Sequence, residues 1–132
     1  MTQRNIYVMD VIVSKIAEGA SFSKATKLVY NKRSVCIPYN EGYFEAPLVD
    51  LGMTSRSTNA LLRARLRTLG DVIEFCVDKK ITEITNLGKS SGVEVFETIL
   101  DYAWDRMTEK EKELFLIDTV ERNSGNIRSE IA

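Results

Sequence analysis

The sequence contains no histidine and only two cysteines among its 132 residues. Without histidine, the protein cannot build a Ser-His-Asp triad, a histidine general base or a histidine-ligated metal site. Cys36 and Cys76 lie far apart and outside any Cys-x-x-Cys spacing, so we expect neither a zinc site nor another metal. Cys76 falls in the apolar run VIEFCV, where we expect a small buried hydrophobic side chain.

Long hydrophobic runs, a glycine-rich nucleotide loop and an N-terminal signal segment are also missing. No apolar run approaches the roughly 20 residues of a membrane span, and no charged segment followed by an apolar stretch and a cleavage site opens the sequence. We therefore expect a cytoplasmic protein with no membrane partner. Without a nucleophile–base pair or a nucleotide loop, we expect no enzyme, no catalytic residue and no cofactor.

Charge is nearly balanced overall, at −1, but it is unevenly distributed along the sequence. Residues 51–92 carry seven basic and four acidic side chains, whereas residues 93–132 carry five and ten. The length allows one ordinary domain, or a small domain with a helical extension. The whole molecule is therefore not a polyanion binder by bulk charge, although its middle section is basic.

Apolar spacing predicts an all-α fold that begins with a helical hairpin. The first helix has one apolar stripe, which consists of Ile6, Met9, Val13, Ile16 and Ala17. A second helix, capped by Ser21, has an expected inner face of Phe22, Ala25, Leu28 and Val29. Such a pair resembles a helix-turn-helix, but simple packing of two helices gives the same pattern, so both interpretations stay open.

A linker with Pro38, Gly42 and Pro47 follows, and its aromatic residues Tyr39, Tyr43 and Phe44 should pack against a neighbouring part. Further helices are expected from a Ser55 cap to Leu66, from a Thr68 cap to Val77, and from Lys89 to about Met107. A Thr108–Glu111 capping box then begins a last helix. Its stripe of Leu114, Phe115, Ile117 and Val120 should pack on the rest of the protein or on a second copy, and the tail after Asn123 should fray. The predicted core of the middle section is Leu61, Leu66, Val72, Phe75, Ile84, Leu87, Val95 or Phe96, and Ile99.

Two motifs in the basic section carry residues suited to nucleic acid. The motif DL-x-x-T-x-RS-x-N-x-L places Arg56 and Asn59 three residues apart, on one helix face that could reach base edges and sugars in a minor groove. In NLGK-x-S, Gly88 permits a left-handed or closely approached backbone just before a helix. The unpaired N–H groups of that helix, with Lys89 and Ser91, favour a phosphate. Each motif, taken alone, also has a purely structural interpretation. The Arg56 motif could be a solvated helix face, and NLGK-x-S could be a turn before a capped helix.

Together, the two motifs and the Gly70-Asp71 pair between them resemble the C-terminal domain of the RNA polymerase alpha subunit. That family is a compact helical DNA-binding module with a helix-hairpin-helix core, and the resemblance covers about 50 residues. It implies that Arg56 enters the minor groove of A/T-rich duplex DNA, while Asn59, Gly88, Lys89 and Ser91 hold the DNA backbone. Glu94 matches the family's acidic residue one turn into the last helix.

Two positions depart from the family pattern. Ser90 stands where the family usually has a second lysine, which removes one phosphate contact. Gly52 replaces an acidic residue that meets sigma factor in the family, so that contact is not carried over.

We therefore expect three parts: an N-terminal helical hairpin plus linker over residues 1–47, an alpha-C-terminal-domain-like module of four to five helices over residues 48–107, and a C-terminal helix and tail over residues 108–132. Because only the hairpin and linker precede the module, we expect a free-standing relative of the family.

Our first hypothesis is a small DNA-binding, transcription-associated protein that uses Arg56 and Asn59 for the minor groove and Gly88, Lys89 and Ser91 for backbone phosphate. The alternative is a protein-interaction module of the same fold that docks to RNA polymerase or another transcription protein without binding DNA. A homodimer through the hairpin or the last helix is a further expected partner. An exposed apolar patch would favour the alternative.

Overall fold

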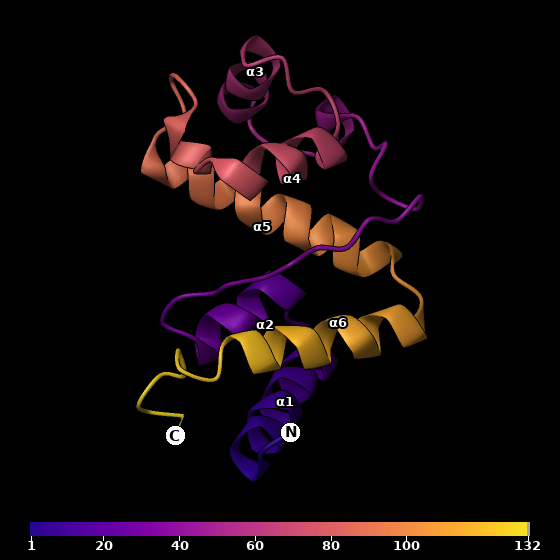
Figure 1. The fold of residues 1–132 in the computed structure, drawn as a ribbon, viewed down its shortest axis with the longest axis vertical. Coiled ribbons are helices and arrows are strands. Elements are labelled where there is room, and N and C mark those ends of the chain that lie inside the picture. The colour runs from indigo at the N-terminus through magenta and orange to yellow at the C-terminus, as the bar shows by residue number, and fades with distance from the viewer. Residues whose placement is uncertain (132) are drawn as a thin grey trace. The chain divides into compact units, whose positions relative to one another are not determined.

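The computed structural model describes residues 1–131 and is all-helical over that range, as predicted (Figure 1). Its elements in sequence order are α1 (Gln3–Ala17), α2 (Phe22–Val29), the 3₁₀ helix η1 (Leu48–Asp50), α3 (Ser55–Arg63), α4 (Leu69–Asp78), the 3₁₀ helix η2 (Ile81–Glu83), α5 (Lys89–Arg106) and α6 (Glu109–Arg122). No helix among the described residues combines the length and hydropathy that a membrane crossing requires.

The protein divides into two compact units, which are described separately. Unit 1 consists of residues 1–37 together with the segment that begins at Met107, and unit 2 consists of residues 38–106. The two ends of the sequence thus form one compact unit, and the middle section forms the other.

Five helices begin at a hydroxyl side chain that accepts a hydrogen bond from the first turn. The capping residues are Thr2, Ser21, Thr54, Thr68 and Thr108. The Ser21 cap, the Thr68 cap and the Thr108–Glu111 capping box were all predicted. The cap of α3 was misplaced by one residue: Thr54 accepts from the Ser57 N–H at 3.3 Å, and Ser55 is already helical.

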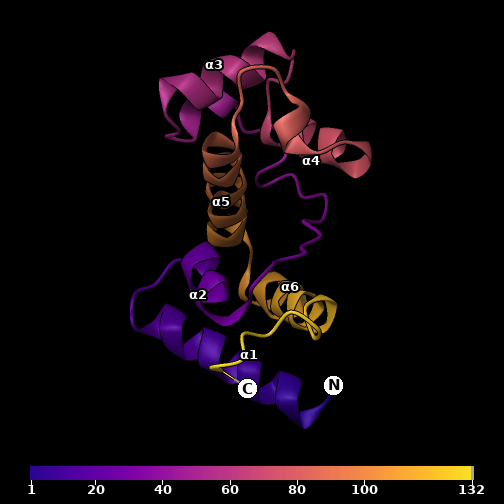
Figure 2. The same cartoon turned by 90° about the vertical axis from the view of Figure 1, so that its left-hand side faces the viewer.

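In unit 1, α1, α2 and α6 pack together around a shared core (Figures 1 and 2). The rings of Phe22 on α2 and Phe115 on α6 lie 5.4 Å apart. Val8 and Ile12 of α1 and Val120 of α6 are fully buried. The last helix therefore packs back on its own unit, which was one of the two expected outcomes.

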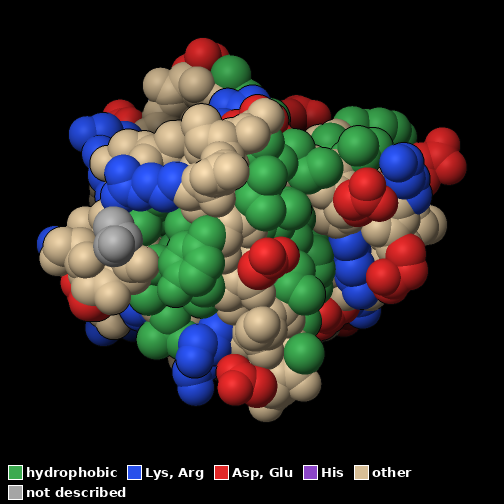
Figure 3. All heavy atoms as spheres, turned by 90° about the horizontal axis from the view of Figure 1, so that it is seen from below, with side chains coloured by type: hydrophobic (Ala, Val, Ile, Leu, Met, Phe, Trp, Pro, Cys, Tyr) green, Lys and Arg blue, Asp and Glu red, His purple; other side chains and the backbone are tan. Residues whose placement is uncertain are grey.

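The buried faces of the unit 1 helices differ from the predicted stripes. On α1, Val8 and Ile12 are buried, whereas Ile6 and Val13 of the predicted stripe are 44% and 50% exposed. Apolar side chains cover about half of this helix, so spacing alone could not choose which part turns inward. Leu28 and Leu114 are likewise exposed. The face drawn in Figure 3 shows hydrophobic side chains interspersed with charged ones.

The segment after α6 does not fray, contrary to the prediction. Asn123 is fully buried, and its side chain accepts from the Ser34 N–H and donates to the Ser34 carbonyl, both at 2.8 Å. Farther on, Ile127 forms an antiparallel bridge with Tyr30, and the Arg128 N–H donates to the Val29 carbonyl at 2.8 Å. The polar composition of this tail therefore supplies hydrogen bonds within unit 1.

In unit 2, the aromatic linker segment lies against the start of α4. The Gly70 N–H donates to the Phe44 carbonyl at 2.9 Å, and a Cβ on Gly70 would lie only 2.7 Å from the Phe44 ring. Tyr43 and Phe44 are buried as predicted. Tyr39 is largely exposed, although its ring stacks edge-on against Phe44 with centroids 5.0 Å apart.

Most of the predicted unit 2 core is buried, namely Leu61, Val72, Ile84, Leu87, Val95 and Ile99. Leu66, Phe75 and Phe96 are only half-buried. Of the two alternatives Val95 and Phe96, the buried core residue is therefore Val95. Cys76 is exposed rather than buried. The reason is that only Leu69, Gly70 and Val72 of α4 are covered, while the second half of this helix lies at the surface.

Candidate nucleic-acid interface

The first turn of α3 presents Arg56 at the surface. Thr54 caps this turn, and Asn59 lies one turn further along, also exposed. Arg56 forms no hydrogen bond or ion pair within residues 1–131. Residues 51–70 contain the basic residues Arg56, Arg63, Arg65 and Arg67 and no acidic residue. The guanidinium of Arg56 is therefore available to an external partner, and it lies in a stretch of sequence with an excess of positive charge.

Glu94 of α5 ties this turn of α3 to α5. Its carboxylate accepts from the Thr54 backbone N–H at 3.1 Å, from the Thr54 hydroxyl at 2.9 Å and from the Ser57 hydroxyl. The hydrogen bond from Ser57 is the largest effect on the pKa of Glu94 and lowers it below its ordinary value of 4.5. Desolvation opposes this shift, and the two hydrogen bonds from Thr54 lower the pKa further. Because Thr54 and Ser57 flank Arg56, we call Thr54, Ser57 and Glu94 the α3–α5 clamp.

The start of α5 differs from that of the other helices. The Gly88 carbonyl accepts from the Gly92 N–H at 2.8 Å, so Gly88 occupies the position before the first helical residue. Within the described residues, no acceptor meets the backbone N–H groups of Lys89, Ser90 and Ser91. Three donors at the positive end of the helix dipole are thus open to an anion.

Of the two backbone features expected at Gly88, a left-handed conformation or a close approach, the left-handed conformation is absent. The positive φ in this motif belongs to Asn86, at 69°, and Gly88 has no positive φ. A Cβ added to Gly88 would meet nothing within 4 Å. The space in front of this residue is therefore open, and the fold itself does not require glycine there.

The five predicted site residues thus lie in the first two turns of α3 and at the start of α5, both in unit 2. Arg56 and Asn59 are on α3, while Gly88, Lys89 and Ser91 are at the beginning of α5. Ser91 is three residues before Glu94, a rise of about 4.5 Å along the helix. The clamp therefore connects the α3 turn to the first turns of α5. Sequence reasoning identified Glu94 only as a family match, and did not foresee this connection.

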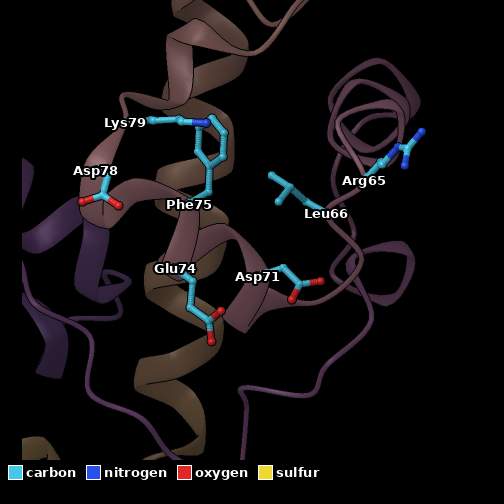
Figure 4. A pocket seen from close by; sticks show the side chains of 7 residues that line it. All are labelled: Arg65, Leu66, Asp71, Glu74, Phe75, Asp78 and Lys79. Carbon is cyan, nitrogen blue, oxygen red and sulfur yellow. The ribbon is translucent and has the colours of Figure 1, made fainter.

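A separate groove of about 390 Å³ lies on the surface of α4 (Figure 4). Its lining residues are Arg65, Leu66, Asp71, Glu74, Phe75, Asp78 and Lys79. The Leu66 side chain points toward Phe75, and the Lys79 amine lies 5.3 Å from the centre of the Phe75 ring (Figure 4). Sequence reasoning missed this groove because it assigned Leu66 and Phe75 to the core. No cluster of residues suited to a metal ion occurs among residues 1–131.

The match to a protein-family model lies within unit 2 and includes no helix of unit 1. The family model for the C-terminal domain of the alpha subunit of bacterial RNA polymerase matches residues 39–101. The DNA-directed RNA polymerase subunit alpha of Gloeobacter violaceus is 33% identical over 57 residues, which are 43% of the present sequence and 18% of that protein. The subunit of Phaeodactylum tricornutum is 32% identical over 59 residues, which are 45% of the present sequence and 19% of that protein.

The match thus spans less than a fifth of the length of these curated relatives. No solved structure matches the protein significantly.

Proposed function

We propose that this protein, whose residues 39–101 form an RNA polymerase alpha C-terminal-domain-like domain, binds A/T-rich duplex DNA in a transcription-associated role. Arg56 enters the minor groove, and Asn59 bonds to groove or backbone atoms beside it. Backbone phosphate is held by the open N-terminus of α5 and by Lys89 and Ser91. The family of the matched segment supports the DNA-binding role, and the geometry of the two helix starts supports this assignment of residues.

The α3–α5 clamp is the observation that carries the proposal. Three hydrogen bonds to Glu94 fix the residues on both sides of Arg56 against α5. An arginine on an anchored helical turn loses little backbone freedom on binding. The entropic cost of ordering the backbone around Arg56 is therefore small. The same carboxylate faces Thr54 and Ser57 and not Arg56, which leaves the guanidinium charge available.

Arginine at this position suits a narrow minor groove. A-tracts narrow that groove and raise its negative potential, which attracts an inserted arginine. The planar guanidinium can donate several hydrogen bonds at once, whereas lysine is a point charge. Because no carboxylate of the described residues competes for Arg56, the side chain can enter the groove without breaking an ion pair.

The start of α5 suits a phosphate for a different reason. Unpaired backbone N–H groups and the helix dipole attract an anion irrespective of DNA sequence. The absence of a Cβ on Gly88 lets a phosphate oxygen approach those groups closely. This contact would set the position of the domain on the duplex, while Arg56 would supply the A/T preference.

A fluorescence-anisotropy titration of the 132-residue protein tests the proposal. Labelled A/T-rich and G/C-rich duplexes of equal length are each titrated at low and at near-physiological salt. We expect tighter binding to the A/T-rich duplex, and an affinity that falls with salt by a log–log slope of about 0.9 per phosphate contact. The variant Arg4→Ala removes an equal charge from an exposed site in unit 1 and serves as a control. Absence of binding to either duplex at low salt would overturn the proposal.

The α4 groove supports a second candidate, the docking of RNA polymerase or another transcription protein without DNA. Val77, next to the groove residues on α4, is 76% exposed, and Phe75 and Leu66 are half-buried. Exposed apolar side chains around a groove are typical of protein-binding sites. Under this alternative, Phe75→Ala with Val77→Ala would weaken co-sedimentation with RNA polymerase and Arg56→Ala would not. If Arg56→Ala weakened co-sedimentation and the double variant on α4 did not, the alternative would be rejected.

A further inference from the structure

The connection between α1 and α2 has the length and the glycine of a helix-turn-helix turn. Residues 18–21 join the two helices, and Gly19 has a φ of +106°. The Gly19 N–H donates to the Ile16 carbonyl and the Ala20 N–H to the Lys15 carbonyl, both at 3.0 Å. A turn of this length with glycine is typical of the motif, whose second helix enters the major groove. Helix α6 packs against α1 as a third helix.

The exposed face of α2 is basic. Phe22, Ala25 and Val29 turn inward, whereas Lys24 and Lys27, one turn apart, are exposed. Residues 21–35 contain the cations Lys24, Lys27, Lys32 and Arg33 and no aspartate or glutamate. The sequence as a whole carries a net charge of −1, so this concentration of positive charge is local.

A distant arginine adds to this group. The Arg128 guanidinium donates from Nε to the Lys27 carbonyl at 3.1 Å, and the Arg128 backbone N–H donates to the Val29 carbonyl at 2.8 Å. These bonds place a fifth positive charge at the end of α2. Because guanidinium has five N–H donors, Arg128 retains donors for a further partner. We call Lys24, Lys27, Lys32, Arg33 and Arg128 the α2 basic cluster.

A purely structural reason accounts for only part of this cluster. Cations near the last turn of a helix satisfy its free carbonyls and complement its dipole. Arg128 does so at the Lys27 carbonyl. Arg33 donates instead to the carbonyl of Ser23, in the first turn of α2, at 2.7 Å, and this bond holds the segment after the helix against it. Lys24 lies in the first turn of α2 and Lys32 lies beyond the helix, so this reason does not explain their exposed charges.

We infer that α2 is a second DNA-contact element, which places its Lys24–Lys27 face in the major groove of duplex DNA. Lys24, Lys27 and Lys32 contact backbone phosphates there, and Arg128 braces the end of the helix. This inference goes beyond the proposed function, because α2 lies outside the segment matched by the family model. It concerns unit 1 alone and makes no use of Arg56 or of the start of α5.

The test compares salt dependence in the 132-residue protein. The double variant Lys24→Ala, Lys27→Ala and the control Lys110→Ala, Lys112→Ala remove equal charge from unit 1, and circular dichroism checks that both remain folded. In the control, both lysines lie among acidic residues at the start of α6. We expect the α2 variant to lower the log–log salt slope for a duplex by about 0.9 for each lost phosphate contact. The A/T preference should be retained.

The outcomes separate this inference from the proposed function. If the slope of the α2 variant equals that of the wild type, the inference is wrong, whatever Arg56→Ala does. If Arg56→Ala leaves binding and A/T preference unchanged while the α2 variant lowers the slope, the proposed function fails and the inference stands. Loss of affinity for a single strand only, with no effect on a duplex, would also overturn the inference.

Discussion

The carboxylate of Glu94 accepts a hydrogen bond from the Thr54 backbone N–H at 3.1 Å, and this bond joins α5 to the first turn of α3. Two hydroxyls, those of Thr54 and Ser57, donate to the same carboxylate. Thr54 also caps α3, so one small network fixes both the start of that helix and its attachment. The position of Arg56, which lies between the two donors in sequence, depends on this network.

Replacing Glu94 by glutamine should make stability depend less on pH. Its hydrogen bonds hold the folded-state pKa below the ordinary value of 4.5. The charged carboxylate therefore stabilises the fold above that value, and its contribution is lost as the pH falls through the folded-state pKa. At neutral pH we expect Glu94→Gln to be less stable by about 1 kcal/mol, since water screens a half-exposed carboxylate.

Urea unfolding of wild type and Glu94→Gln at neutral pH and below pH 4.5 measures this difference. The difference should shrink in acid. Glu74→Gln, which changes an exposed carboxylate on α4, is the matched control and should behave as wild type. A stability gap that grows in acid would contradict the clamp.

Replacing Gly70 by alanine should destabilise unit 2. The added Cβ would lie 2.7 Å from a ring atom of Phe44 and 2.9 Å from its carbonyl oxygen. Because the carbonyl belongs to the backbone, relief requires the linker segment to move, at a cost of about 1–3 kcal/mol. In the control Gly125→Ala, the Cβ meets nothing within 4 Å. Equal unfolding midpoints for the two variants would show that the linker segment does not lie against α4.

Replacing Asn123 by alanine should destabilise unit 1. The change removes four side-chain hydrogen bonds, which join Asn123 to the Ser34 N–H, the Ser34 carbonyl, the Thr119 carbonyl and the Asn126 side-chain amide. A buried donor or acceptor left without a partner costs about 1–3 kcal/mol. Asn59→Ala, at an exposed asparagine, should leave thermal stability unchanged. If Asn123→Ala has the same melting temperature as the wild type, Asn123 does not hold the segment after α6 in the way that the structure describes.

Replacing Gly88 by alanine should separate folding from binding. Nothing lies within 4 Å of the added Cβ and Gly88 has no positive φ, so thermal stability should be retained. If a phosphate approaches the start of α5, however, the methyl group obstructs it, and the affinity for duplex DNA should fall. Unchanged affinity would argue against the phosphate contact at this helix start.

Sequence reasoning predicted the helices better than the faces they bury. Helix starts depend on local chemistry, and Ser21, Thr68 and Thr108 cap as predicted. Burial depends on neighbours distant in sequence. On α1 the apolar residues form a broad arc, and only the packing of α2 and α6 decides that Val8 and Ile12 turn inward.

The candidate site shows the same division between local and distant information. Arg56 and Asn59 could be assigned to one helix face and Lys89 to a helix start from their motifs, and the structure shows all three exposed on those helices. The attachment of α3 to α5 could not be predicted, because Glu94 and Thr54 are 40 positions apart and nothing in their local pattern pairs them. The local left-handed conformation, which was expected at Gly88 as one of two alternatives, occurs instead at Asn86, two residues earlier.

The most direct test of the proposed DNA binding compares Arg56→Ala with Lys89→Ala in titrations against A/T-rich and G/C-rich duplexes. Both side chains are exposed, so both variants should remain folded. We predict that Arg56→Ala loses most of the preference for the A/T-rich duplex, because the negative potential of a narrow minor groove attracts an inserted arginine. Lys89→Ala should instead weaken binding to both duplexes equally and lower the salt slope by about 0.9. Equal binding of wild type and Arg56→Ala to the A/T-rich duplex would contradict the account.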